Sequence, residues 1–156
     1  MASGKEHTLG TILLTPLTGL FAWHLSQGDQ AITILASTGC LSGIFISPDL
    51  DMQTRTVSET TLVRWSWTIG YIWIFLWYPY ALFFKHRGIS HCPLVGTCTR
   101  LLYMVGYAFL LQEILRHTMD IEGHLMYWLK NHAITLSIFS AGLAISDIGH
   151  WFMDNF

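Results

Sequence analysis

The sequence predicts an all-α membrane protein in which four spanning helices form a bundle and an additional aromatic helix lies at the membrane surface. Three observations predict this fold class. Apolar residues make up 52% of the 156 residues and charged residues only 12%, whereas soluble domains carry about 25% charged residues. Residues 8–28 and 31–48 form two runs without a charged side chain. Each run approaches the ~20 residues that an α-helix needs to cross a bilayer.

The chain has the length of a single domain, and its charge disfavours one class of partner. A net charge of −2 offers no basic face for nucleic acid. The three cysteines form no Cys-x-x-Cys pair and predict no disulfide framework. Lys5 before an apolar run resembles the start of a signal peptide, but Pro16 interrupts the run and no Ala-x-Ala site follows closely. We therefore expect a retained first helix.

The first two helices are expected to form an antiparallel hairpin. Residues 27–30 supply a short polar turn between them. Ser47 and Pro48 end the second helix, because the residue before a proline is pushed out of the α region. The polar residues 51–61 that follow predict a loop.

The segment 65–84 is an uncharged run of 20 residues, ten of which are Trp, Tyr or Phe. Its length fits a spanning helix, which would give five spans. Its aromatic side chains are typical of the headgroup level, and Pro79 places a helix breaker inside it. These features favour an interfacial or re-entrant helix. Aromatic residues are also enriched at protein interfaces, so 65–84 is the expected contact surface for a larger membrane complex.

The second half of the chain predicts two long helices. Pro93 suits the first turn of a helix that runs to about Arg116. Arg100 lies inside this helix and must face protein or reach an interface. Residues 116–130 predict a polar loop, and the last helix is expected over 132–154.

Imidazoles and carboxylates gather at the ends of the apolar segments, and these are ligands of borderline and hard divalent metals. Asp147, His150 and Asp154 are spaced i, i+3, i+7 and share one helix face. Of Asp49 and Asp51, one is expected to ligate a metal and the other to bridge metals or orient a histidine. A polar helix end and a turn-forming Pro-Asp pair are the purely structural alternatives.

The segment 86–91 supplies a further pair of imidazoles. His86 and His91 flank Gly88, which breaks a helix and lets the chain fold around an ion. Arg87 cannot ligate a metal, but its planar fork suits a phosphate or a carboxylate. Cys92 directly follows His91 and could approach a metal, although packing is the favoured role.

The positions of these residues favour four spans over five. If 65–84 stays at the interface, His7 and all the groups above fall on one side of the membrane. If 65–84 spans the membrane, the bilayer separates His7, Asp49 and Asp51 from His86, His91, Asp147 and His150. Ionisable groups near a membrane are costly and usually have a partner, so this separation disfavours five spans. On the four-span count, five basic residues share the site face: Lys5, Arg55, Arg64, Lys85 and Arg87. The positive-inside rule then places the site on the cytoplasmic face.

A second, weaker metal site on the opposite face could use His117, Asp120, Glu122 and His124.

The joint pattern resembles a known family along the whole chain. Its elements are Ser-Gly-Lys-x-His (3–7), Ser-Pro-Asp-Leu-Asp (47–51), His-Arg-Gly-x-Ser-His (86–91) and Asp-x-x-His-Trp-x-x-Asp (147–154). They resemble an uncharacterised family of bacterial membrane proteins that bind metal, and they are similar to the LexA-regulated inner-membrane metal-dependent hydrolases. Both groups look like distant relatives of the zinc-dependent phospholipase C and P1 nuclease superfamily. The resemblance implies a helical protein of a bacterial inner or internal membrane. It also implies one to three divalent ions, zinc above all, with these ligands: His7, Asp49, Asp51, His86, His91, Asp147, His150 and Asp154.

The expected function is metal-dependent hydrolysis of a phosphoester or lipid-like substrate at the membrane surface. A bound metal would lower the pKa of water towards ~7. Asp49 or Asp51 would act as general base, and Arg87 would hold the phosphate. Membrane lipids are the expected partners. The alternative is a non-catalytic subunit or assembly factor of a larger membrane complex, in which a structural metal ties the helix ends together.

Overall fold

The protein is all-α, as predicted. The computed structural model describes residues 3–52, 54–86, 88–119 and 124–156, and this part of the chain contains helices and no strand. The elements are α1 (Gly4–Leu25), α2 (Gln30–Ser42), the 3₁₀ turn η1 (Pro48–Asp51), α3 (Val57–Trp65), α4 (Trp67–Phe83), the 3₁₀ turn η2 (Ile89–His91), α5 (Val95–Met119), α6 (Leu125–Asn131) and α7 (Ala133–Asn155).

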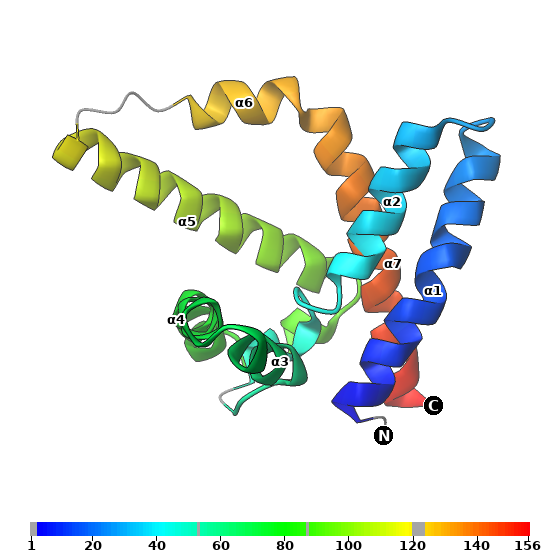
Figure 1. The fold of residues 1–156 in the computed structure, drawn as a ribbon, viewed down its shortest axis with the longest axis horizontal. Helices are drawn as coiled ribbons and strands as arrows, with labels where there is room; N and C mark the ends of the chain where they lie inside the picture. Colours follow the sequence, from blue (N-terminus) through cyan, green and yellow to red (C-terminus); the bar gives the residue numbers. More distant parts are fainter. Residues whose placement is uncertain (1–2, 53, 87, 120–123) are drawn as a thin grey trace.

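Helices α1, α2 and α7 pack side by side as a bundle (Figure 1). The predicted hairpin between α1 and α2 is present, and Asp29 caps α2 by accepting hydrogen bonds from the backbone of Ala31 and Ile32 at 2.8 and 3.1 Å. Two glycines let α2 and α7 approach closely. A Cβ on Gly39 would lie 2.0 Å from the Phe139 carbonyl oxygen, and a Cβ on Gly142 would lie 2.1 Å from that of Ala36. Small residues at a helix interface permit this approach.

The expected helix over 31–48 is shorter in the structure, because α2 ends at Ser42. Gly43 caps it, and residues 43–46 form a turn before η1 begins. A helix of 13 residues rises about 20 Å, less than the ~30 Å hydrocarbon core of a bilayer.

The predicted loop over 51–61 is wrong in its second half, where α3 begins at Val57. The reason is a local capping box. The Thr56 hydroxyl accepts from the Glu59 N–H at 3.2 Å, and the Glu59 carboxylate accepts from the Thr56 N–H at 2.9 Å. The predicted break at Pro79 does not occur either, since α4 continues through it to Phe83.

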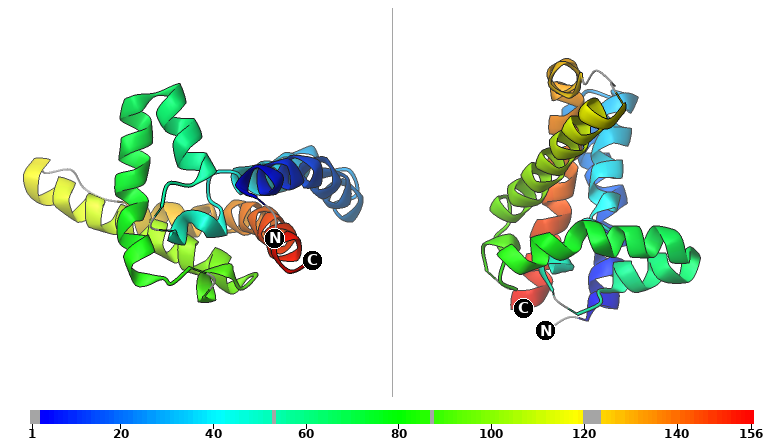
Figure 2. Two further views of the ribbon diagram at one scale, coloured as in Figure 1. Left: turned by 90° about the horizontal axis from the view of Figure 1, so that it is seen from below. Right: turned by 90° about the vertical axis from the view of Figure 1, so that its left-hand side faces the viewer.

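Helix α4 runs across the direction of the α1–α2–α7 bundle. It is seen nearly end-on in Figure 1 and from the side in the right-hand view of Figure 2. Its inner face completes a hydrophobic core, because Trp77 and Tyr80 are fully buried and pack with Leu50 and Leu143. Part of the aromatic segment therefore supports the fold directly behind the candidate site.

By length and apolar composition, two helices in the described part of the chain are able to span a membrane, namely α1 and α7. Helix α2 is apolar but shorter, and α5 carries Arg100, Glu113 and Arg116. This count differs from the predicted four spans, because a tight turn shortens α2 and charged side chains lower the hydropathy of α5.

Candidate metal centre

The candidate site forms where four elements meet at one end of the bundle. The N-terminal turn of α1, η1, η2 and the C-terminal turns of α7 converge there, and the two chain ends lie side by side (Figures 1 and 2). Seven of the eight predicted ligands are brought together in three overlapping groups. The groups are His7, His150 and Asp154; Asp49, His91 and His150; and Asp51, His86 and His91.

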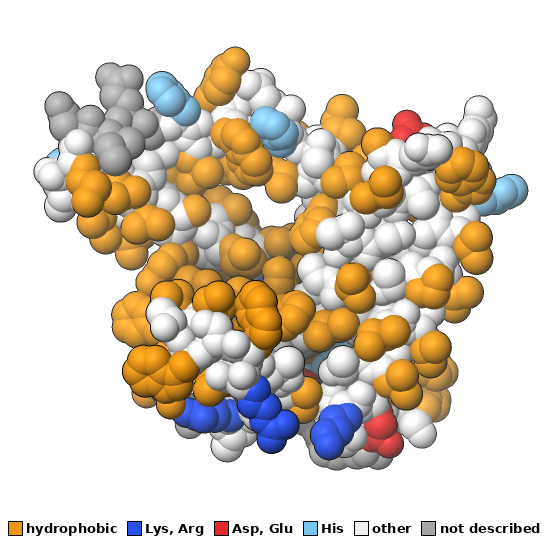
Figure 3. All heavy atoms as spheres, viewed as in Figure 1, with side chains coloured by type: hydrophobic (Ala, Val, Ile, Leu, Met, Phe, Trp, Pro, Cys, Tyr) orange, Lys and Arg blue, Asp and Glu red, His pale blue; other side chains and the backbone are white. Residues whose placement is uncertain are grey.

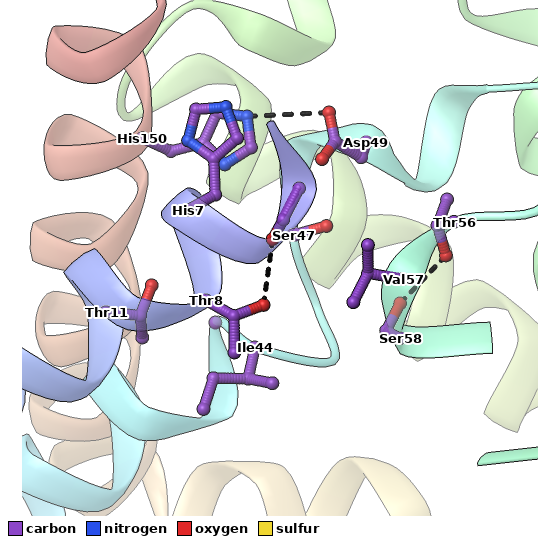
Figure 4. A pocket seen from close by; sticks show the side chains of 12 residues that line it. His7, Thr8, Thr11, Ile44, Ser47, Asp49, Thr56, Val57, Ser58 and His150 are labelled. Carbon is purple, nitrogen blue, oxygen red and sulfur yellow. Dashed lines mark hydrogen bonds and ion pairs between the residues drawn. The ribbon is translucent and has the colours of Figure 1, made fainter. Parts of the chain in front are cut away.

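The central group joins η1, η2 and α7. The Asp49 Oδ1 atom lies 3.5 Å from His150 Nε2 and 3.6 Å from His91 Nε2. Figure 4 shows Asp49 extending from its turn toward His150. Both imidazole nitrogens are buried and have no hydrogen-bond partner. The two Nε2 atoms thus converge on one carboxylate oxygen, at distances longer than that of a good hydrogen bond.

The second group joins the two ends of the chain. His7 stacks on His150 with ring centroids 3.7 Å apart (Figure 4). Its Nε2 atom lies 3.2 Å from Asp154 Oδ1, while the other oxygen of Asp154 lies 3.5 Å from His150 Nε2. The i, i+4 spacing of His150 and Asp154 on α7 produces this proximity. Asp154 therefore lies between two imidazoles.

The third group is centred on Asp51, which is fully buried. Its Oδ1 atom pairs with His86 Nδ1 at 2.7 Å, and its Oδ2 atom lies 3.2 Å from His91 Nδ1. The Ser90 hydroxyl also donates to Oδ2. A carboxylate bonded to one imidazole nitrogen sets the tautomer and orientation of the ring, so that the other nitrogen can bind a metal. Asp51 has this relation to His91, whose Nε2 faces Asp49.

The spacing of the central atoms fits a divalent cation. In a tetrahedral zinc site with bonds of 2.0–2.2 Å, two ligand atoms lie about 3.4 Å apart. The separations of 3.5 and 3.6 Å around Asp49 Oδ1 match that edge length closely. Buried polar atoms without a partner are rare in folded proteins, and a cation would satisfy both nitrogens at once.

The carboxylates and imidazoles of the centre shift one another's pKa. Burial alone would raise the pKa of Asp49, but the imidazoles of His150 and His91 outweigh it and hold that pKa well below its usual range. Burial also acts to raise the pKa of Asp51, and contacts with His91, Ser90 and His86 lower it below the ordinary value. For His91, the two carboxylates overcome burial and raise its pKa to about 9. Both acidic groups are therefore ionised at neutral pH, as metal ligands must be.

The eighth predicted ligand, Asp147, lies in a different environment. Its Oδ2 atom accepts from the fully buried Arg100 guanidinium and from the Thr97 hydroxyl, both on α5. The same guanidinium donates to the Ser90 carbonyl oxygen at 3.2 Å, and the Ser90 hydroxyl bonds to Asp51. This buried network ties α7 and α5 to η2 and η1. Asp147 thus faces α5, and it belongs to none of the three ligand groups, contrary to the prediction.

Sequence reasoning left Arg100, Ser90 and Thr97 out of the site. Arg100 could have been found, because an isolated arginine in an apolar helix implies a buried partner. Arg87, the predicted phosphate ligand, lies outside the described residues, as do Asp120 and Glu122 of the alternative second site. Cys92 is exposed.

Two cavities adjoin the cluster. The first holds about 20 Å³ beside His7, Asp49 and His150, room for about one water molecule. The second holds about 450 Å³ between η2 and the end of α7, and both His91 and Asp154 line it. In the described part of the chain, this larger cavity gives a small molecule a route to the cluster.

Comparison with known proteins gives a match along almost the entire chain. Residues 2–156 match the family described as "Uncharacterized metal-binding protein (DUF2227)". An uncharacterized protein of Aquifex aeolicus (strain VF5) is 39% identical over 64 residues, which cover 41% of this chain and 39% of that protein. This chain therefore matches less than half of that relative's length. No solved structure matches the chain significantly. The predicted uncharacterised metal-binding family is thereby confirmed.

Proposed function

This chain belongs to the uncharacterized metal-binding protein family, and from that premise we propose that it is a metal-dependent hydrolase of a phosphoester or lipid-like substrate at a membrane surface. One observation carries the proposal. His91 and His150 each direct a buried nitrogen without a hydrogen-bond partner at the same Asp49 oxygen. The similarity of the 47–51 and 86–91 motifs to the LexA-regulated hydrolases, and more distantly to phospholipase C and P1 nuclease, supports hydrolysis as the reaction class.

We assign the main ion to Asp49, His91 and His150, with Asp154 as the fourth ligand. Mixed imidazole and carboxylate donors at tetrahedral spacing favour zinc. His150 belongs to the first and second groups, and its Nε2 atom faces both Asp49 and Asp154. One imidazole nitrogen binds one ion at a time, so these two groups would hold a single ion between them. This sharing favours one or two ions over three, with His7 and His86 as the ligands that would extend the centre.

Asp49, Asp51 and Arg87 have different chemical roles in the proposed reaction. A divalent ion, when bound, polarises a phosphoryl oxygen and lowers the pKa of water towards ~7. Asp51 is fully buried and is occupied by His86, Ser90 and His91, so it orients the imidazoles. The Asp49 side chain is 21% exposed, so of the two carboxylates it is the one that a water molecule can reach, and we assign the role of general base to it. Arg87 directly follows His86 and remains our candidate for holding the phosphate.

We place the protein in a bacterial inner or internal membrane, with the site at the cytoplasmic face. In this arrangement α1 and α7 cross the membrane, the shorter α2 and the more polar α5 complete the proposed four-helix bundle beside them, and α4 lies at the interface. The outer face of α1 is apolar and exposed, with Leu13, Leu17 and Leu20 about 60% accessible. Exposed basic side chains gather along the lower edge of the molecule, near the site end (Figure 3). This distribution supports the cytoplasmic orientation.

Metal analysis and hydrolysis assays test the proposal together. Protein purified without chelators should contain stoichiometric zinc and should hydrolyse a generic phosphodiester such as bis(p-nitrophenyl) phosphate. His91→Ala should lose both properties. His24→Ala is the matched control, because His24 is exposed at the opposite end of α1. Stoichiometric metal with no turnover across a broad panel of phosphoesters would refute the enzymatic proposal.

A non-catalytic role in a membrane complex is the second candidate, and the outer face of α4 favours it. Trp67, Phe75 and Phe83 are 70%, 71% and 83% exposed, and aromatic side chains are enriched at protein interfaces. In this case a structural metal joins the helix ends. Extraction in a mild detergent followed by mass determination separates the candidates, since a small homogeneous oligomer disfavours a complex subunit.

A further inference from the structure

The larger cavity at the cluster is lined by both polar and apolar side chains. Its volume of about 450 Å³ lies within the ~300–1,000 Å³ typical of small-molecule sites. The polar part of the lining consists of His91, Asp154 and Asn155. The apolar part consists of Trp151 and Pro93, and Trp151 is 41% exposed. A ligand that fills the cavity must therefore combine a polar group with an apolar one.

The polar lining residues favour an anionic oxygen group. His91 and Asp154 belong to different ligand groups, so a ligand beside both side chains contacts the cluster at two of its groups. A divalent ion, when bound there, would offset the negative carboxylates and attract oxyanions. The exposed Lys5 and Lys85 are close in sequence to His7 and His86, which adds positive charge at this end of the molecule.

Exposed apolar side chains neighbour the cavity residues in the chain. Ile89 lies between Gly88 and His91, Leu94 follows Pro93, and the two side chains are 63% and 60% exposed. Phe152 and Phe156, at the end of α7, are 57% and 87% exposed. Trp151 lies near the end of a helix long enough to span a membrane, and tryptophan is enriched where hydrocarbon meets water. In the membrane placement proposed above, the cavity lies at the level of the lipid headgroups.

We infer that this cavity binds an amphiphile with a phosphate headgroup, with the phosphate toward His91 and Asp154 and the hydrocarbon against Trp151 and Pro93. The inference rests on the proposed function and names its substrate class as a lipid phosphate ester. Free phosphate shares the headgroup chemistry but lacks the part that contacts Trp151. The two ligands are therefore distinguishable by the role of that side chain.

Cys92 provides a direct measure of cavity occupancy, because it lines the cavity and is exposed. Cys98 is also exposed but lies on α5 outside the cavity lining, so it serves as an internal reference. The experiment follows alkylation of both thiols by N-ethylmaleimide, by mass spectrometry, on zinc-loaded protein in neutral detergent. The probes are a non-hydrolysable phosphonate analogue of phosphatidic acid, diacylglycerol and inorganic phosphate.

The phosphonate lipid is expected to slow alkylation of Cys92 and to leave Cys98 unchanged. Diacylglycerol and inorganic phosphate at the same concentration should have little effect on either thiol. Trp151→Gln should raise the lipid concentration needed for half-protection by about tenfold, the scale of one lost apolar contact. Trp67→Gln is the matched control, since Trp67 is an exposed tryptophan on α4 and should change nothing. Metal content and the Cys98 rate report whether each variant is folded.

Three results would overturn the inference. An unchanged Cys92 rate with the lipid, in protein that carries zinc, refutes the cavity assignment and leaves the metal centre intact. Equal protection by inorganic phosphate refutes the amphiphile. Protein that contains no metal after purification without chelators refutes the proposed function itself, and the inference fails with it.

Discussion

The ion pair between Arg100 and Asp147 is expected to be among the most costly interactions to break in this protein. Arg100 is completely buried, and the Asp147 side chain is 3% exposed. The guanidinium also donates to the Ser90 carbonyl oxygen. Arg100→Met keeps a long apolar side chain in place but leaves the Asp147 carboxylate buried without its cationic partner. The free energy of unfolding should therefore fall by about 3–5 kcal/mol.

A surface pair on the same helix provides the control. Arg116 bonds to Glu113 at 2.8 Å, but the two side chains are 54% and 47% exposed. Solvent screening limits such a pair to about 0.5 kcal/mol, so Arg116→Met should have little effect. The double variant Arg100→Met with Asp147→Leu removes both buried charges and should recover much of the lost stability.

Unfolding of the purified variants, followed by circular dichroism during denaturant titration, measures these differences. The reasoning is refuted if Arg100→Met is as stable as Arg116→Met. It is also refuted if the double variant is no more stable than Arg100→Met alone, because the loss would then come from packing and not from an unpaired buried carboxylate.

Two further predictions concern the metal centre and the helix packing. The carboxylates of Asp49 and Asp51 raise the pKa of His91 from 6.5 to about 9. In metal-free protein, the contribution of these contacts to folding stability is therefore complete below pH 6.5 and is lost as the pH rises through 9. Metal must displace this proton, so its affinity should rise by up to about tenfold per pH unit between pH 7 and 9. Calorimetric titration in buffers of different ionisation enthalpy should detect the released proton, and an affinity independent of pH would contradict the His91 assignment. Gly142→Ala places a Cβ against the Ala36 carbonyl oxygen and should destabilise the protein by about 1–3 kcal/mol. Gly106→Ala, where a Cβ meets open space, should be neutral or stabilising by up to ~1 kcal/mol; equal unfolding midpoints for the two variants would contradict the close approach of α2 and α7.

Most of the secondary structure was predictable from local patterns in the sequence. Charge-free runs and the final helix were predictable because apolar composition and polar turns act over neighbouring residues. Local information also encodes the start of α3, although a loop was predicted there, because Thr56 and Glu59 form a recognisable capping box. The length of α2 was not predictable from composition, because the turn after Ser42 adds no charge to the run. Nor was the passage of α4 through Pro79, since tertiary packing of Trp77 and Tyr80 overrides the local preference.

The choice of imidazoles and carboxylates as candidate ligands came from the sequence by itself, because side-chain chemistry is a property of each residue. Tertiary structure alone decided which of these groups meet. It directs His91 and His150 at Asp49, and it surrounds Asp51 with two imidazoles and a serine. It also pairs Asp147 with Arg100, 47 residues away, although Asp147 shares a helix with His150. The partner of a buried charge depends on distances of a few ångströms between distant segments, and no local pattern encodes them.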